Sequence, residues 1–328
     1  MTSRPSHSAP DTIDEADLVE LRPVVLGLCY RMLACPFAAE GAAQETLTRT
    51  WRQRNRFDPA RASLRTWSLR IATNVCIDHL RSASRRSVPT DLEGPSTPTA
   101  DVGAPIPNSR LVMPIPTRVL EGETVGLDPA AAVGLRESVR LAFVAALQHL
   151  SPVERATLLL REVFALPASE VAAGIGRSEA AVTSALGRAR RKLAEHDLSL
   201  DGGRSGRGDG PDGPDHPCAR RSYVAAFGAH DIAAMVALIA DDVAMTMPPY
   251  PWWARGRDHV RASLEGTDFC RGTRLVPVSV NGAAGFGHYL PLGEGGRLGD
   301  RRHRPRPRVL QAWARRLRRP RSRRSGPG

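Results

Sequence analysis

A row of polar side chains at helical spacing is the first feature of this sequence that could do chemistry. Arg70, Asn74, Asp78 and Arg81 recur at intervals of 4, 4 and 3 residues, and Trp67 precedes them. Residues three and four apart share one face of a helix. Such a face can stack on unpaired bases, hydrogen-bond to them and hold phosphates. Taken alone, the pattern favours the simpler alternative, a solvated helix face with Trp67 in the core.

A second pattern lies between residues 166 and 193. Residues 169–173 predict a short helix, residues 174–177 a glycine-containing turn, and Ser178 an N-cap for a second helix. One apolar face of the second helix is formed by Val182, Ala185, Leu186, Ala189 and Leu193. Two helices joined in this way form a helix-turn-helix, whose second helix reads the major groove. The alternative is an ordinary helical hairpin with a solvated basic face.

The elements that must position these side chains follow from composition and periodicity. Residues 18–86 have few helix breakers, eight prolines interrupt residues 88–129, and Ser151 to Glu154 forms a capping box with proline at the first helical position. The predicted order is a disordered N-terminus (1–17), a helical domain (18–86), a Pro-rich linker (87–134), a helix-turn-helix domain (135–197), a flexible linker (198–217), a partial α+β domain (218–290) and an Arg/Pro/Gly-rich disordered tail (291–328).

The third domain has its own pattern. Residues 222–240 predict two short helices split at His230 and Asp231, residues 243–247 a strand, and residues 258–264 another helix. The sequence therefore predicts a mainly α protein with two small helical domains and an incomplete α+β domain.

Charge and cysteine content are weak guides here. The net charge is +12, but residues 291–328 hold thirteen Arg against Glu294 and Asp300, a net +11, which leaves +1 for the first 290 residues. The five cysteines have no zinc spacing, so we expect reduced, mostly buried thiols and no metal. No run of apolar residues predicts a membrane span or a signal peptide, so we expect a cytoplasmic protein.

Two ordered groups of motifs resemble the extracytoplasmic-function (ECF) subfamily of sigma-70 RNA polymerase sigma factors. Residues 29–33 (CYRML), 43–47 (AQETL), 63–67 (SLRTW), 70–74 (RIATN) and 78–81 (DHLR) resemble region 2 of that family. Residues 150–193 resemble its helix-turn-helix region 4. Residues 111–116 (LVMPIP) and 120–122 (LEG) resemble the linker of a subgroup with a C-terminal SnoaL-like domain, and residues 223–289 resemble the start of that domain, in the nuclear-transport-factor-2 superfamily.

The resemblance implies roles for three groups of residues. A helix docking on the clamp coiled coil of the polymerase large subunit would present Gln44, Glu45, Arg49 and Arg52. The melted −10 element would be contacted by Trp67, Arg70, Asn74, Asp78 and Arg81. The −35 element would be read by Ser178, Glu179, Ala181, Thr183, Ser184, Arg188 and Arg191. The linker would thread through the polymerase between the two reading domains.

Further implications concern partners and control. The resemblance implies core RNA polymerase and promoter DNA as partners, no membrane, no cofactor and no catalytic residue. It also suggests control in cis by the SnoaL-like domain, with a small molecule as a further partner of that domain.

Several residues depart from the family pattern. Gly41 stands where an Asp is usual, Gly187 where a Gln is usual, and Gly174 replaces an apolar residue before the turn. Gly41 removes a carboxylate and costs roughly 1 kcal/mol of helix propensity, so we expect weaker polymerase docking. Gly187 in mid-helix and Gly174 before the turn predict a less stable −35 reader. From about residue 290 the alternation of a sheet is lost. Our hypothesis is a shifted reading frame of GC-rich DNA; the alternative is an Arg-rich arm that binds nucleic acid nonspecifically.

Two other functions fit parts of the sequence. The first is a stand-alone helix-turn-helix regulator that binds duplex DNA without polymerase. The second is a SnoaL-like enzyme with Asp231, Asp258 or His259 as acid/base candidates, although each of these is equally explained as a helix cap or surface group.

Overall fold

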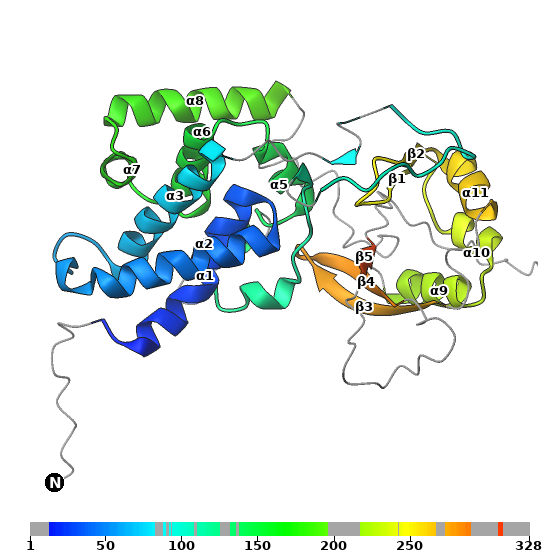
Figure 1. The fold of residues 1–328 in the computed structure, drawn as a ribbon, viewed down its shortest axis with the longest axis horizontal. Coiled ribbons are helices and arrows are strands. Elements are labelled where there is room, and N and C mark those ends of the chain that lie inside the picture. Colours follow the sequence, from blue (N-terminus) through cyan, green and yellow to red (C-terminus); the bar gives the residue numbers. More distant parts are fainter. Residues whose placement is uncertain are drawn as a thin grey trace, which may run out of the picture. The chain divides into compact units, whose positions relative to one another are not determined.

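A computed structural model gives the fold of the chain (Figure 1). The structure describes residues 13–82, 88–89, 92, 94–107, 110–124, 132–135, 138–195, 217–241, 243–266, 273–289 and 308–310. They divide into two compact units, one built from residues 1–84 and 118–197 and the other from residues 85–117 and 198–328.

The first half of the first unit is a helical cluster. Its elements are α1 (Glu15–Leu33), α2 (Pro36–Arg52), the short 3-10 helix η1 (Arg54–Arg56) and α3 (Leu64–Ser82). A capping box between Asp14 and Asp17 begins α1, and Pro36 occupies the first turn of α2. Apolar residues of α1 and α3, including Leu28, Leu69 and Val75, are buried where the three helices pack.

The second half of the first unit is the helix-turn-helix. Its elements are η4 (Thr117–Leu120), α5 (Leu141–Leu147), α6 (Pro152–Leu158), the π-helical turn η5 (Leu159–Val163), α7 (Ala168–Ile175) and α8 (Glu179–Glu195). The predicted capping box of Ser151 and Glu154 is confirmed at the start of α6. All five residues of the predicted apolar face of α8 are buried, where α8 packs on α6 and α7.

The second unit is α+β. Its helices are α9 (Pro217–Gly228), α10 (Ile232–Ala237) and α11 (Arg257–Glu265), and its strands are β1 (Ala244–Thr246), β2 (Trp253–Arg255), β3 (Arg274–Val280), β4 (Ala283–Tyr289) and β5 (Arg308–Leu310). The predicted break at His230 and Asp231 is confirmed: His230 has φ 55°, and Asp231 caps α10.

The strands form two small antiparallel sheets. β1 pairs with β2, and the other sheet has the order β3, β4, β5. Asn281 and Gly282, both at positive φ, make the tight turn between β3 and β4; this dipeptide is favoured in two-residue hairpin turns. β5 lies within the segment predicted as a disordered tail and differs from that prediction, because pairing with β4 uses backbone groups and needs no alternating side-chain pattern. The rest of residues 290–328 lies outside the described residues.

Part of the predicted Pro-rich linker makes hydrogen bonds to the second unit. Within the second unit, Ile106 N–H donates to Pro249 O at 2.7 Å and Ser96 N–H to Trp253 O at 2.8 Å. Ile115 N–H donates to Asn281 Oδ1 at 2.9 Å. Ile115 is buried, as are Leu111 and Val112. Residues 94–117 therefore pack with the α+β unit, because their apolar side chains gain more from burial than from exposure to water.

Candidate nucleic-acid interface

The predicted −10 residues lie along α3, and the structure gives them different surroundings. Trp67 is half-buried, with its ring centroid 5.3 Å from that of Phe57. Asp78 and Arg81 are exposed and form an ion pair at 2.9 Å. The remaining two residues of the row, Arg70 and Asn74, contact α7 of the helix-turn-helix.

Six of the predicted −35 residues lie on α8 and Ser178 directly precedes it, and all seven are exposed. Gly176, at φ 63°, makes the turn between α7 and α8, a left-handed conformation that favours glycine. Ser178 Oγ accepts a hydrogen bond from Ala181 N–H at 3.2 Å. The N-terminus of α8 and its polar side chains are thus exposed at the surface.

Glu154 anchors the basic part of α8. Its carboxylate accepts from Arg188 Nε at 3.2 Å and from Lys192 Nζ at 2.8 Å. Burial would raise the pKa of Glu154, but hydrogen bonds from Lys192 and from Ser151 outweigh it and lower the pKa from 4.5 to about 2. Glu154 therefore stays ionised and holds α8 on α6, while half of the Arg188 side chain remains exposed.

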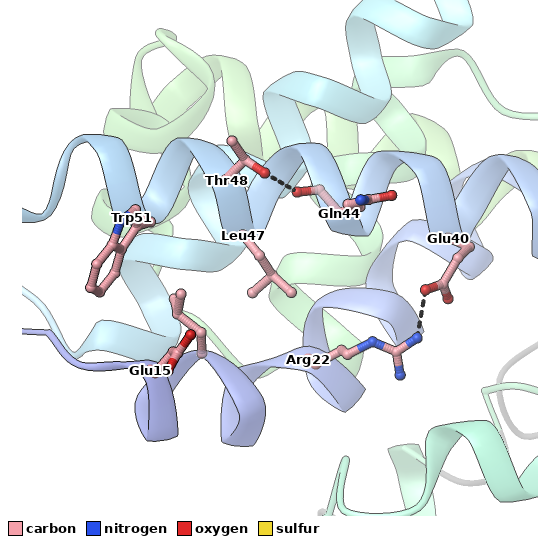
Figure 2. A pocket seen from close by; sticks show the side chains of 8 residues that line it. Glu15, Arg22, Glu40, Gln44, Leu47, Thr48 and Trp51 are labelled. Carbon is pink, nitrogen blue, oxygen red and sulfur yellow. Dashed lines mark hydrogen bonds and ion pairs between the residues drawn. The ribbon is translucent and has the colours of Figure 1, made fainter.

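The predicted polymerase-binding residues lie on α2 in two settings. Gln44 lines a groove of about 580 Å³ between α1 and α2, together with Leu47 and Trp51 (Figure 2). Glu45 instead forms an ion pair with Arg49 at 2.5 Å and lies 3.4 Å from His79 of α3. Arg52 is exposed at the end of α2.

The groove contains residues that the sequence analysis did not single out. Arg22 and Glu40 form an ion pair at 2.5 Å across it, and Trp51 lies under Arg54, 4.2 Å from the guanidinium carbon to the ring centroid. The helical spacing of Gln44, Leu47 and Trp51 is a signal that could have identified this face. The residues of α1 that line the groove could not be predicted from the sequence of α2 alone.

The enzyme candidates of the second unit lie at a helix cap and on the surface. Asp231 caps α10 by accepting from Ala234 N–H at 2.9 Å. Asp258 and His259 are exposed on the first turn of α11, and His259 Nδ1 lies 3.2 Å from Arg255 O. These positions match the cap and surface explanation.

The described residues hold neither a metal-ligand cluster nor a membrane-spanning helix. In those ranges, no cluster of three or more His, Cys, Asp and Glu side chains could hold a metal ion, and no helix is long and apolar enough to cross a membrane. Cys29, Cys35 and Cys76 are buried and Cys218 is exposed, and none of these four forms a disulfide in the described part. Cys270 lies outside the described residues.

Comparison with known proteins places the chain in a family. Three family models match it: Sigma-70 region 2 over residues 18–86, Sigma-70, region 4 over residues 140–193, and a SnoaL-like domain over residues 220–284. The ECF RNA polymerase sigma factor SigG of Mycobacterium tuberculosis (strain ATCC 25618 / H37Rv) is 39% identical over 279 residues, which are 83% of this chain and 72% of SigG. The chain therefore belongs to the ECF RNA polymerase sigma factor family.

SigJ is another protein to which the chain is similar, in sequence and in its solved structure. SigJ of the same strain is 28% identical over 234 residues, 71% of this chain and 64% of SigJ. The crystal structure of Mycobacterium tuberculosis SigJ covers 86% of this chain and 88% of its own, with 24% identity and a TM-score of 0.48. The family predicted from the sequence is confirmed, as is the mainly helical fold with a SnoaL-like third part.

Proposed function

We propose that this protein binds core RNA polymerase in the cytoplasm and directs initiation at promoters with −35 and −10 elements. The observation that carries this proposal is the exposed row on α8, held by the Ser178 cap and the Glu154 anchor in a chain that also carries the polar face of α3. Arg188 and Arg191 would fix the register on phosphates, while Thr183 and Ser184 reach base edges.

On the −10 side, Trp67 would stack on an unpaired base. Arg70, Asn74, Asp78 and Arg81 would bond to bases and phosphates of the melted strand. Polymerase docking would use Gln44, Glu45, Arg49 and Arg52, together with the groove that Trp51 lines. We propose no catalytic residue, because Asp231, Asp258 and His259 act as caps and surface groups.

Run-off transcription tests this function. Purified core polymerase is supplied with the chain and a library of genomic fragments, and discrete transcripts are expected that core polymerase alone does not give. Binding to duplex DNA without any polymerase-dependent start would instead favour a stand-alone helix-turn-helix regulator.

Control in cis by the SnoaL-like unit is the second part of the proposal. Its support is the packing of residues 94–117 on that unit, through the bonds of Ile106 to Pro249 and of Ile115 to Asn281. A linker held in this way is not available to thread through polymerase, so a small molecule that alters the unit would alter initiation. Deleting residues 218–328 should change run-off yield severalfold, and an unchanged yield would contradict the control.

A further inference from the structure

The turn between β3 and β4 contains a buried polar side chain. Asn281 and Gly282 are the two residues of this turn, both at positive φ. Asparagine is favoured there because it tolerates positive φ, and asparagine side chains are mostly exposed in proteins. Asn281 is only 1% exposed. The turn conformation does not require a buried amide, so this side chain has a second use.

That use is a reciprocal pair of hydrogen bonds with Ile115 of the Pro-rich segment. Ile115 N–H donates to Asn281 Oδ1 at 2.9 Å, and Asn281 N–H donates to Ile115 O at 3.0 Å. Ile115 is itself 1% exposed. A buried backbone N–H without a partner is costly, so the side chain of Asn281 makes the burial of Ile115 possible.

The proline that follows fits the same pairing. Pro116 forms an antiparallel bridge with Val280. The bond beside this bridge runs from Asn281 N–H to Ile115 O, which makes Pro116 the member of the bridge that is not hydrogen-bonded. Proline has no N–H to donate, and none is needed at this position.

Thr117 binds the other side of the turn. Its Oγ1 accepts from Gly282 N–H at 3.0 Å and from Ser279 Oγ at 2.9 Å. A valine at this position would have the same shape but no acceptor. Each residue of the Ile-Pro-Thr sequence therefore matches one feature of the turn.

The Pro-rich segment has a second anchor on the same unit, and that anchor is less specific. Ser96 N–H donates to Trp253 O, and Ile106 N–H donates to Pro249 O. These bonds join backbone groups, which every residue except proline can supply. The only printed side-chain bond of this anchor is the long one, 3.4 Å, from Trp253 N–H to Ser96 Oγ. Recognition by side chains is thus concentrated at the β3–β4 turn.

The recognised residues end where the chain passes from one unit to the other. Residues 85–117 belong to the second unit, and η4, which begins at Thr117, continues into the first. A segment tethered in this way is present at an effective concentration on the order of millimolar. A few hydrogen bonds are then enough to hold it, and a small change at the turn is enough to release it.

We propose that the β3–β4 turn is a strand-binding site that recognises Ile115, Pro116 and Thr117, and that its hold on them is the point at which the second unit controls the linker. The inference rests on the proposed function, in which the linker threads through polymerase. It adds the three residues that are recognised, and it assigns their recognition to Asn281.

Hydrogen exchange in the full chain, followed by mass spectrometry, tests the site. Asn281→Gly keeps the turn, because glycine adopts positive φ, and keeps the backbone bond to Ile115 O, but it removes the Oδ1 acceptor. Exchange in a peptide spanning residues 111–120 should become about tenfold faster, while exchange in α3 stays at the native rate. Ser96→Ala, at the other anchor, is the matched control and should leave residues 111–120 unchanged. Native exchange in Asn281→Gly would overturn the site.

A second pair of variants leaves the turn itself intact. Thr117→Val removes the acceptor for Gly282 N–H and should speed exchange of residues 111–120 about threefold, a smaller effect because Gly282 is exposed to water. Thr117→Ser keeps the hydroxyl and should exchange at the native rate. Equal exchange in these two variants would contradict recognition of Thr117. This pair still decides if Asn281→Gly does not fold.

Run-off transcription tests the control. Asn281→Gly should change the yield in the same direction as deletion of residues 218–328 and by about half as much or more, whereas Ser96→Ala should not change it. If the deletion changes the yield but a fast-exchanging Asn281→Gly chain does not, the proposed control point is wrong. If neither the native chain nor any variant supports run-off transcription, the sigma function is wrong, and hydrogen exchange still tests the strand-binding site.

Discussion

Helices α3 and α8 carry the two predicted reading faces, and the structure treats them differently. On α8 all seven predicted residues are exposed and the support lies beneath, in Glu154. On α3 two of five predicted residues contact α7: Arg70 is partly buried, and Asn74 stays exposed while it donates to Gly174 O. The comparison teaches that two faces predicted from the same kind of pattern can differ in how far their side chains are engaged within the chain. The predicted residues of α8 are all exposed, whereas Arg70 and Asn74 of α3 already have partners on α7.

The largest expected effect is on the brace, the buried ion pair between Arg31 of α1 and Glu123. Arg31→Met leaves Glu123 buried without its partner, and breaking a buried ion pair costs about 3 to 5 kcal/mol. We expect a loss of that order in the free energy of unfolding, measured by urea denaturation. The double variant Arg31→Met with Glu123→Leu should recover most of it. A single variant as stable as the native chain would show that the brace carries no stability.

The next largest effect is expected at Glu154, which supports the exposed face of α8. The pKa of Glu154 is lowered from 4.5 to about 2 in the folded chain. Its contribution to stability is therefore fully present above about pH 4.5 and is lost as the pH falls toward 2, a change of about 3 kcal/mol. Urea denaturation as a function of pH should show this loss, and Glu154→Gln should remove that part of the pH dependence. An identical acid profile in the variant would contradict the anchor.

The smallest effect separates reading from support on α8. Arg188→Ala should weaken binding of promoter duplex by polymerase holoenzyme about fivefold to tenfold and lower the salt dependence by about one phosphate contact. Arg190→Ala is the control, because Arg190 is exposed on the same helix, pairs with Glu162, and is outside the predicted reading row. Equal losses of promoter binding in the two variants would mean that α8 contributes only positive charge and that the position of Arg188 on the helix does not matter.

Much of this arrangement could be predicted from local sequence. The capping box at Ser151, the split between α9 and α10, and the apolar face of α8 depend on neighbouring residues, and they were predicted. The hydrogen bond between Arg31 and Glu123 joins residues that are 92 positions apart, and no local sequence pattern near either residue predicts it. Gly174 was predicted to make the helix-turn-helix less stable. Its close approach to Arg70, 104 residues away in the sequence, could not be predicted from its neighbours.

The Pro-rich segment shows the same limit. Its prolines disfavour regular helix, and the described residues 94–107 and 110–116 contain no α-helix. Composition cannot say which surface Ile115 will contact, because its partner Asn281 lies in a hairpin more than 160 residues further along. Long-range burial of short apolar stretches is therefore the part of the fold that pattern analysis misses.

The most direct test measures the separation of the two halves of the first unit. Fluorescent labels are placed at Ala60→Cys and Ala194→Cys, both exposed and outside the predicted reading rows, in a chain with Cys218→Ser and Cys270→Ser. Energy transfer should be high in the free chain and fall close to zero when the holoenzyme binds a genomic fragment that it transcribes. Transcription with energy transfer unchanged would contradict the account.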